Sequence, residues 1–416
     1  MSVSAAGPSQ GAKAPCASEA QGEPARGGSA AREAASVGVQ RAALVAGEAS
    51  GDLLGALLLQ AMKQRWPNLQ TSGIAGPRMQ SRGCEAWWPQ AMLAVRGYAE
   101  VLPHLRKLLK VRKELGDRLL ANKPDVFIGI DAPDFNFDLE KRLKSGGIPT
   151  VHFVSPSFWA WRAKKLVKLK TAVDHVLCVF PFEPALLAQH GIAATYVGHP
   201  VANMVPLVPD KAAARAALGL GERDTVVAVL PGSRQGEIKY LASRFFQACR
   251  HIQQAHPAIK FVVPAIPALK PQIDKLAAQS GLGEALQVVS GQSHAVLAAC
   301  DVTLIASGTA TLEAALFKRP MVIAYNMHWL SWQIMRRKML QPWVGLPNIL
   351  SGEFVVPEFL QDAATPTALA QAVLAWLNQP ERVAAVQQRF ADLHQELKRD
   401  TAHLAVQAIE RTLKLS

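Results

Sequence analysis

Short apolar segments alternate with helical stretches along most of the chain, and this alternation restricts the fold more than any other feature. The segments are Ala42–Ala46, Asp125–Ile130, Thr150–Val154 and His175–Phe180, and then, after a proline-containing stretch from His199 to Pro209, Thr225–Leu230, Lys260–Val263, Ala285–Val289, Val302–Ile305 and Met321–Tyr325. Continuous apolar strands of this kind are typical of parallel sheets covered by helices on both faces. The sequence therefore predicts an α/β protein with two doubly wound, Rossmann-like domains facing a central cleft, with ligands at the carboxyl ends of the strands.

The length and local composition indicate how the chain is divided. At 416 residues, it exceeds what a single hydrophobic core usually serves. Residues 1–38 are mostly Ala, Gly, Ser, Pro, Glu and Gln without a periodic apolar pattern, so we expect a disordered tail. We expect an N-terminal domain over residues 39–205 and a C-terminal domain over residues 206–416. The terminal helices of the C-terminal domain, after about Thr365, are expected to pack on the first domain or on a partner subunit.

Composition also excludes several classes of protein. No run of about 18 uninterrupted apolar residues is present, which argues against a membrane-spanning helix. The chain does not begin with a charged segment followed by an apolar one, which argues against a secretory signal. The five cysteines are far apart and include no CxxC pair, so neither a disulfide framework nor a structural zinc site is expected. A reducing cytoplasm fits this pattern best.

The positive charge is concentrated in three segments. The chain has a net charge of +13, made up of +5 between Arg96 and Lys123, +5 between Ser157 and Lys170, and +3 over Arg336–Lys338. Such patches favour an anionic partner, either nucleic acid, anionic lipid or a phosphorylated substrate. The alternative for each patch is a solvated helix face.

The first of these segments has the pattern of a basic amphipathic helix. Between Val101 and Leu120, apolar residues recur at spacings of three and four, and basic residues lie beside or opposite them. Helices of this kind bind anionic membrane surfaces, although the same leucine stripe would also fit packing on a sheet. No nucleic-acid-binding motif is present, so we expect no nucleic-acid partner. The residues expected to face the membrane are Val101, Leu105, Leu108, Arg106, Lys107 and Lys110.

Two loops in the second domain resemble anion-binding turns. After Leu230, Gly232 allows close backbone approach, Ser233 can cap the next helix, and Arg234 can grip a phosphate with two hydrogen bonds. After Ile305, the small residues Ser307, Gly308 and Thr309 open another helix, and Glu313 could accept hydrogen bonds from ribose hydroxyls. Neither loop is a G-x-G-x-x-G or Walker motif. The alternative is that both loops are ordinary helix caps and that Glu313 is an acid in the first turn of its helix, stabilised by the helix dipole.

In the first domain, the strand that ends at Ile130 is followed by Asp131, Asp134 and Asn136. A carboxylate at this position can act as a general base on a hydroxyl nucleophile. No third metal ligand stands at a suitable spacing, so no metal is expected, and Asp134 could instead cap the following helix. Within the loop 47–52, Glu48 and Ser50 are candidates for the same cleft; alternatively, Asp52 caps the next helix.

Taken together, these motifs resemble those of the lipid-A-disaccharide synthases, a family of inverting glycosyltransferases with the GT-B architecture. The matching segments are VAGEASGD (45–52), GIDAPDFN (129–136), VSPSFWAW (154–161), YVGHP (196–200), LPGSR (230–234), SGTATLE (307–313) and LPNIL (346–350). The resemblance begins at about Arg41 and continues into the C-terminal helices.

The resemblance implies transfer of a diacylglucosamine unit from UDP-2,3-diacylglucosamine to 2,3-diacylglucosamine 1-phosphate, giving a β-1,6 disaccharide and UDP without a metal or cofactor. It implies that the first domain binds acceptor and membrane and the second binds UDP-sugar, on the cytoplasmic face of a Gram-negative inner membrane. It is also compatible with a homodimer. The resemblance makes Asp131 the general base, Arg234 the diphosphate ligand, Glu313 the ribose ligand and Asn348 a polar residue near the donor. Arg162 or Lys165 would then meet the acceptor phosphate.

Other functions stay open on sequence grounds. Another GT-B transferase or a UDP-sugar epimerase would share the nucleotide loops but would not need the basic amphipathic helix. A non-catalytic lipid- or nucleic-acid-binding protein would explain the charge but not the two anion-binding loops.

Overall fold

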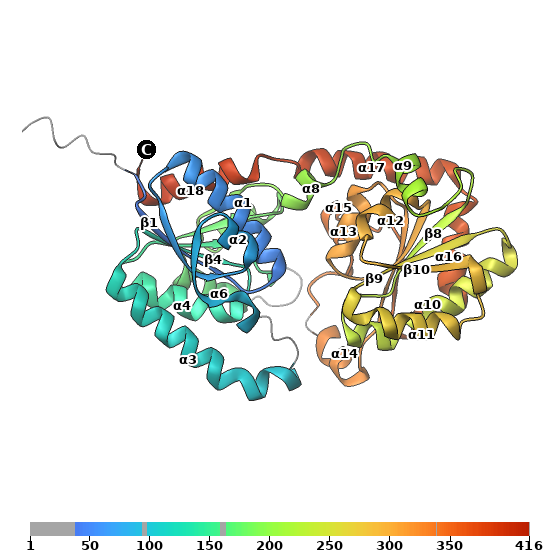
Figure 1. The fold of residues 1–416 in the computed structure, drawn as a ribbon, viewed down its shortest axis with the longest axis horizontal. Helices are drawn as coiled ribbons and strands as arrows, with labels where there is room; N and C mark the ends of the chain where they lie inside the picture. The colour runs from blue at the N-terminus through green and yellow to red at the C-terminus, as the bar shows by residue number, and fades with distance from the viewer. Residues whose placement is uncertain (1–37, 94–97, 159–163, 338, 416) are drawn as a thin grey trace, which may run out of the picture. The chain divides into compact units, whose positions relative to one another are not determined.

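The computed structural model describes residues 38–93, 98–158, 164–337 and 339–415 of the chain (Figure 1). The expected tail therefore lies almost entirely outside the described residues. Residues Val39–Ser416 form one compact unit, which contains two separate parallel sheets.

The N-terminal sheet has seven parallel strands in the order β3-β2-β1-β4-β5-β6-β7. Its strands are β1 (Arg41–Ala46), β2 (Gln70–Ala75), β3 (Cys84–Pro89), β4 (Val126–Ile130), β5 (Thr150–Phe153), β6 (His175–Cys178) and β7 (Ala194–Tyr196). Its helices are α1 (Ala49–Arg65), α2 (Pro77–Ser81), α3 (Tyr98–Asn122), α4 (Pro133–Ser145), α6 (Lys164–Ala172) and α7 (Glu183–Gln189). The strand order changes direction between β1 and β4, which is the point where doubly wound folds bind ligands.

The C-terminal sheet repeats this arrangement with six parallel strands, in the order β10-β9-β8-β11-β12-β13. Its strands are β8 (Val226–Leu230), β9 (Lys260–Ala265), β10 (Leu286–Ser290), β11 (Val302–Ala306), β12 (Met321–Tyr325) and β13 (Glu358–Leu360). Its helices include α9 (Lys211–Ala217), α10 (Gln235–Ala255), α11 (Lys270–Ala278), α12 (Ser293–Ala299), α13 (Thr309–Leu316), α14 (Trp329–Arg336) and α15 (Leu346–Ser351). The expected pair of doubly wound α/β sheets is confirmed.

The strands that the sequence predicted are all present, and four further strands were missed. The missed strands are β2, β3, β7 and β13. Strand β2 contains polar Gln70, Thr71 and Ser72, while β3, β7 and β13 lie at sheet edges, so none shows the continuous apolar run of a central strand.

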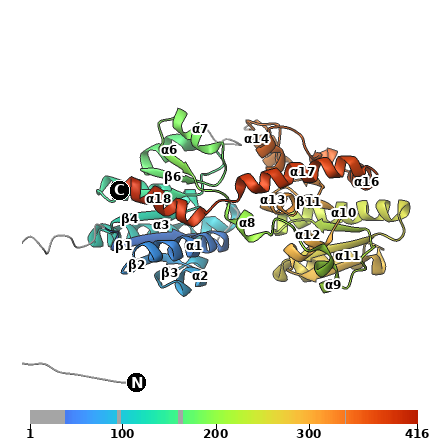
Figure 2. The same cartoon turned by 90° about the horizontal axis from the view of Figure 1, so that it is seen from above.

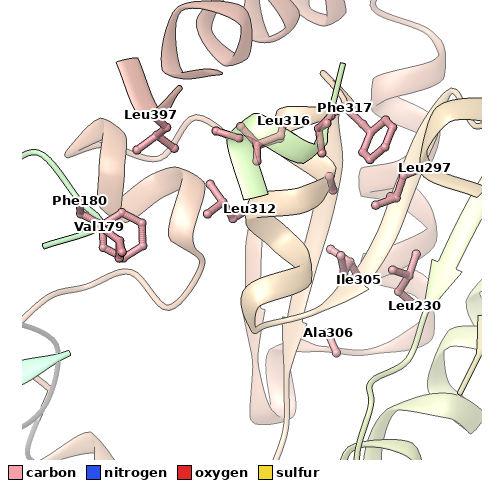
Figure 3. Close-up of a cluster of buried hydrophobic side chains, with 14 of the residues drawn as sticks. Val179, Phe180, Leu230, Leu297, Ile305, Ala306, Leu312, Leu316, Phe317 and Leu397 are labelled. Atoms are coloured by element: carbon pink, nitrogen blue, oxygen red, sulfur yellow. The ribbon is translucent and has the colours of Figure 1, made fainter. Parts of the chain in front are cut away.

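A large buried side-chain cluster supports the carboxyl ends of the C-terminal strands. Leu230 ends β8 and Ile305 lies near the end of β11, and both belong to the same buried cluster as Leu312 and Leu316 of α13 (Figure 3). The loops that follow β8 and β11 are therefore anchored on a close-packed core, as a binding site requires.

Helix α3 divides into two unlike halves. It runs beside α4 on one face of the N-terminal sheet (Figure 1), where Val111, Leu115 and Leu119 are buried in a second apolar cluster. In the half of α3 from Val111 onward, the leucine stripe therefore packs on the sheet, as the alternative interpretation expects. In the other half, Leu105 is 41% exposed and Leu109 is 44% exposed. The side chain of Val101 lies outside the described residues.

The chain ends with three helices, α16 (Pro366–Leu377), α17 (Pro380–Leu397) and α18 (Thr401–Leu413). Helix α17 contacts α13 and also the short helix α8 (Pro200–Met204), which lies in the proline-containing stretch from His199 to Pro209 between the two expected domains. Helix α18 packs on α1 and β6, so the C-terminal segment returns to the N-terminal sheet (Figure 2). None of the described helices is long and apolar enough to cross a membrane.

Candidate active site

The turn from β8 to α10 brings the exposed side chain of Arg234 next to the carboxylate of Glu237. The Glu237 carboxylate accepts hydrogen bonds from the backbone N–H groups of Ser233 (2.7 Å) and Arg234 (3.3 Å), and it pairs with the Arg234 side chain at 3.0 Å. A Cβ on Gly232 would overlap the Glu237 side chain. The prediction that Ser233 caps the helix is wrong, because Arg234 is the N-cap residue and its N–H is bound by the Glu237 carboxylate.

This turn is nevertheless suited to anions, since the chain's own carboxylate occupies it. The Arg234 side chain is 61% exposed and available to a ligand. Glu237 was missed in the sequence, although an acid three residues into a helix is the usual signal for a capping box.

The second turn, from β11 to α13, contains one residue that faces the protein and two that face solvent. The Ser307 hydroxyl donates to the Val344 carbonyl at 2.8 Å, so this side chain fixes a neighbouring loop. Gly308 and Thr309 are exposed, and a Cβ on Gly308 would meet nothing within 4 Å. The start of α13 is therefore open to a ligand at Gly308 and Thr309.

Glu313 has a partner that the sequence analysis did not identify. Its carboxylate lies 3.3 Å from Nε2 of His294, on α12, and the His294 ring packs edge-on against Phe317 at 5.3 Å. The hydrogen bond to Glu313 raises the pKa of His294. This contact holds the carboxylate in the middle of α13, between Thr309 and Leu316, and no pattern in the sequence connects the two residues.

Asn348 is fully buried, and its side chain holds the segment from Val355 to Glu358. Its amide nitrogen donates to the Val356 carbonyl and to Glu358, both at 2.8 Å, and its oxygen accepts from the N–H groups of Val355 and Val356. The Glu358 carboxylate also accepts from the N–H groups of Val344 and Gly345, and burial raises its pKa. Both polar atoms of the Asn348 side chain are therefore engaged within the chain, and its place near the donor stays a prediction.

We therefore expect Asn348→Ala to lower stability more than it lowers donor affinity. Removing the amide leaves buried groups without partners, which costs about 1–3 kcal/mol. Thermal unfolding should show a lower Tm than the wild type. Asn378→Ala, at an exposed position, is the control, and equal Tm losses in the two variants would contradict this role.

In the N-terminal sheet, Asp131 stands on a tight turn directly after β4. Its N–H donates to the Phe153 carbonyl at 2.9 Å, and its carbonyl accepts from the Asn136 amide at 2.8 Å. Asp131 and the following Ala132 both have positive φ values, 52° and 44°. Within the described part of the chain, the Asp131 carboxylate makes no hydrogen bond or ion pair, so it remains available to a substrate.

The other residues expected in this cleft differ in position. Asn136 is fully buried and holds the Asp131 turn, which corrects its expected place in an open cleft. Asp134 is exposed but does not cap α4, whose N-cap residue is Ala132. Helix α1 begins at Ala49, so exposed Ser50 lies in its first turn rather than in a loop, and Glu48 is its N-cap residue.

Asp52 has a structural role. Its buried carboxylate accepts from the N–H groups of Gly76, Arg78 and Met79, at 2.9 to 3.0 Å, and so caps α2 rather than the helix that contains it. Among the described residues, no group of three His, Cys, Asp or Glu side chains is arranged to hold a metal ion.

Comparison with known proteins places this geometry in a family. A model of the lipid-A-disaccharide synthetase family matches residues 42–409. The chain is 64% identical to the lipid-A-disaccharide synthase of Albidiferax ferrireducens, over 89% of this chain and 97% of the relative. It is 58% identical to that of Verminephrobacter eiseniae, over 90% of this chain and 97% of the relative.

Solved structures agree on the fold. A UDP-N-acetylglucosamine 2-epimerase from Listeria monocytogenes, described as putative, aligns with a TM-score of 0.65 at 12% identity, over 91% of this chain and 98% of that one. A glycosyltransferase from Rickettsia africae aligns with a TM-score of 0.57 at 12% identity, over 92% of this chain and 100% of that one. At such low identity, the epimerase match carries the GT-B-like fold alone and does not favour epimerase activity. The extent and identity of the sequence matches show that the chain belongs to the lipid-A-disaccharide synthase family, glycosyltransferases that form the lipid A disaccharide.

Proposed function

We propose that this enzyme transfers 2,3-diacylglucosamine from its UDP donor to the 6-hydroxyl of 2,3-diacylglucosamine 1-phosphate, forming a β-1,6 disaccharide and UDP in lipopolysaccharide synthesis. The observation that supports the catalytic part is the position of Asp131. It follows β4 directly on a strained turn, and its half-buried carboxylate has no partner among the described side chains. A base needs this availability, because a carboxylate already engaged in an ion pair is a poor proton acceptor.

The proposed reaction is a single in-line displacement with inversion. The acceptor hydroxyl attacks the anomeric carbon of the donor as Asp131 takes the hydroxyl proton, and the bond from that carbon to the UDP oxygen breaks. The leaving diphosphate gains negative charge, which Arg234 and the exposed start of α13 at Gly308 and Thr309 can stabilise. Glu313, held by His294, would accept hydrogen bonds from the ribose.

In this proposal, Glu237 closes the turn after β8 when no donor is bound. Its carboxylate accepts hydrogen bonds from the N–H groups of Ser233 and Arg234, where a phosphate would bind. A diphosphate entering the turn must displace this carboxylate, so Glu237 competes with the ligand for the same donors.

The acceptor phosphate would meet basic residues near β5. Arg162, one candidate, lies outside the described residues, and the side chain of the other candidate, Lys165, is not described either. Their assignment therefore stays a prediction from the sequence.

We also propose that the first half of α3 contacts an anionic membrane surface on the cytoplasmic face of the inner membrane. Leu105 and Leu109 are exposed there together with Arg106, Lys107 and Lys110, and Leu108 is half-buried. Exposed leucines flanked by cations fit an interface where acyl chains lie beneath anionic headgroups.

The double substitution Leu105→Ser and Leu109→Ser should weaken binding to vesicles that contain phosphatidylglycerol. Each leucine loses part of a transfer free energy of about 1.5–3 kcal/mol, so we expect at least about a tenfold loss of affinity in flotation assays. Leu207→Ser is the matched control, because this leucine is 43% exposed and lies in the proline-containing stretch from His199 to Pro209, away from α3. Equal losses for both variants, or binding unaffected by phosphatidylglycerol, would rule out this surface.

Homodimer formation stays a proposal as well. Helix α18 packs on α1 within one chain, and a second copy could supply the same contact by exchanging its C-terminal segment. Sedimentation of the purified protein in detergent gives the oligomeric state directly.

The direct test of the proposed reaction is release of UDP in detergent by the purified protein. UDP should appear only when both diacylated substrates are present, and soluble UDP-N-acetylglucosamine should not replace the donor. Rapid turnover of the soluble sugar alone would instead favour a different GT-B enzyme.

A further inference from the structure

Three non-glycine residues with a positive φ stand directly after β4 and β5. Asp131 and Ala132 have φ values of 52° and 44°, and Val154, directly after β5, has a φ of 78°. None of the three is glycine, and a β-branched residue at positive φ is a marked outlier. Strain of about 1–3 kcal/mol per residue persists only where the surrounding structure enforces it.

A buried ionisable pair lies beside this strained region and has no part in the proposed proton transfer. Nδ1 of His152, on β5, lies 2.7 Å from Oε1 of Glu140, on α4, and both side chains are fully buried. The Phe137 ring packs on His152 with the ring centroids 4.9 Å apart. Burial raises the pKa of Glu140. The pair therefore joins α4 to β5 inside the N-terminal domain.

Strand β4 leaves room for this pair at Gly129, two residues before Asp131. A Cβ on Gly129 would overlap Oε1 of Glu140 and would lie 3.1 Å from Cγ of Asn136. Glu140 and Asn136 therefore both rest on the backbone of the strand that ends at Asp131. Glycine at this position makes their close approach possible.

Both ends of the Asp131 backbone are tied to the two elements that the pair joins. The Asp131 carbonyl accepts from Asn136, on α4, and the Asp131 N–H donates to Phe153, on β5 and next to His152. Any shift of α4 relative to β5 would pull the two hydrogen bonds apart. The Glu140–His152 contact resists this shift from inside the fold.

The unpaired polar atoms of the pair and of Asn136 show that the pair does not serve stability alone. Oδ1 of Asn136, Oε2 of Glu140 and Nε2 of His152 are buried without a hydrogen-bond partner in the described part of the chain. Each such group costs about 1–3 kcal/mol, and apolar side chains of similar shape would avoid this cost. A cluster of this kind beside a functional residue points to a role in that function.

We propose that Glu140 and His152 are positioning residues for Asp131, acting through Asn136 and the backbone of β5. They fix the strained turn so that the carboxylate meets the acceptor hydroxyl at the correct distance and angle. A misplacement of about 1 Å at such a site can lower the rate about 100-fold. This inference rests on the proposed role of Asp131 as the base.

The test compares Glu140→Gln with Glu183→Gln in the UDP-release assay. Glu183 is a matched control because it is another fully buried carboxyl group in the same domain, where it accepts from the Phe180 N–H at 3.1 Å. We expect Glu140→Gln to lower kcat about 10- to 100-fold with KM for both substrates nearly unchanged. Glu183→Gln should lower Tm but leave kcat within about twofold of the wild type.

A double-mutant cycle separates positioning from a general loss of structure. In an Asp131→Asn background, Glu140→Gln should cause no further loss of kcat, since the group that it positions is gone. If it lowers kcat equally in both backgrounds, or if Glu183→Gln lowers kcat as much, the proposal is overturned.

Asn136→Ser keeps the experiment decisive should Glu140→Gln fail to fold. It removes the amide that holds the Asp131 carbonyl, so it should lower kcat in the same way and likewise add nothing to Asp131→Asn. A wild-type kcat in Asn136→Ser would reject the positioning role. A wild-type enzyme that releases no UDP would instead reject the proposed function itself.

Discussion

Asp131→Asn should lower kcat by about 10²- to 10⁴-fold, because an amide cannot take the proton from the acceptor hydroxyl. Asparagine has nearly the same shape, and the backbone contacts of Asp131 with Phe153 and Asn136 do not involve its carboxylate. We therefore expect folding, Tm and UDP affinity to stay close to those of the wild type. Steady-state kinetics with both lipid substrates, together with calorimetric UDP titration, measure these quantities.

Asp134→Asn is the matched control for this prediction. Asp134 lies three residues further on, is exposed and stands in the first turn of α4. A loss of kcat in Asp134→Asn as large as that in Asp131→Asn would assign the base to the wrong carboxylate. A small loss in both variants would leave the reaction without its proposed base.

The second large effect is expected from Arg234→Ala. Removing a donor aimed at developing charge typically lowers kcat by about 10²- to 10³-fold. The guanidinium would also bind the diphosphate of the unreacted donor, so KM for the UDP-sugar should rise while KM for the acceptor changes little. Initial rates over a grid of donor and acceptor concentrations separate the two KM values.

Arg234→Lys and Arg223→Ala complete this series. Lysine keeps the charge but loses the planar fork, so it should restore only part of kcat. Arg223 is exposed in the segment that precedes β8, and its removal tests the effect of net charge alone. If Arg223→Ala raised KM for the donor as much as Arg234→Ala, the turn after β8 would not be the diphosphate site.

The strands and their ends could be predicted from the sequence because central parallel strands are apolar on both faces. The apolar run that ends at Ile130 is fully buried in β4, and this run alone predicts that Asp131 stands at the carboxyl end of a strand. Strands β3 and β7 lack this signal, because β3 contains Glu85 and ends in Pro89 and β7 has only three residues. Position at an edge is not the whole reason, since β10 also lies at an edge and was predicted.

Contacts between distant residues were less predictable. Asn136 was expected in the cleft because it follows a strand end, and Asn348 was expected near the donor because of the family resemblance. Their burial depends on Glu358 in one case and on Asp131 and Gly129 in the other, and only the folded chain brings these partners together. The Glu140–His152 pair shows no pattern in the sequence at all, because the two residues lie on a helix and a strand that meet only through tertiary packing.

Helix α3 shows that hydrophobic periodicity predicts a helix but not which part of it is buried. A single apolar stripe runs through the helix, but among its described side chains those buried in the apolar cluster begin at Val111. The spacing of the leucines is the same in both halves, so it cannot tell a packed face from an exposed one. Leu105 and Leu109 are exposed because they do not pack in the apolar cluster that buries the rest of the stripe.

Identification of the product is the most direct test of the central claim. Purified enzyme would be incubated with UDP-2,3-diacylglucosamine and 2,3-diacylglucosamine 1-phosphate in detergent, and the product examined by mass spectrometry and NMR. We predict one disaccharide 1-phosphate per UDP released, joined by a β-1,6 linkage. Free diacylglucosamine, an epimerised UDP-sugar or an α-linked product would contradict an inverting transfer to the acceptor hydroxyl.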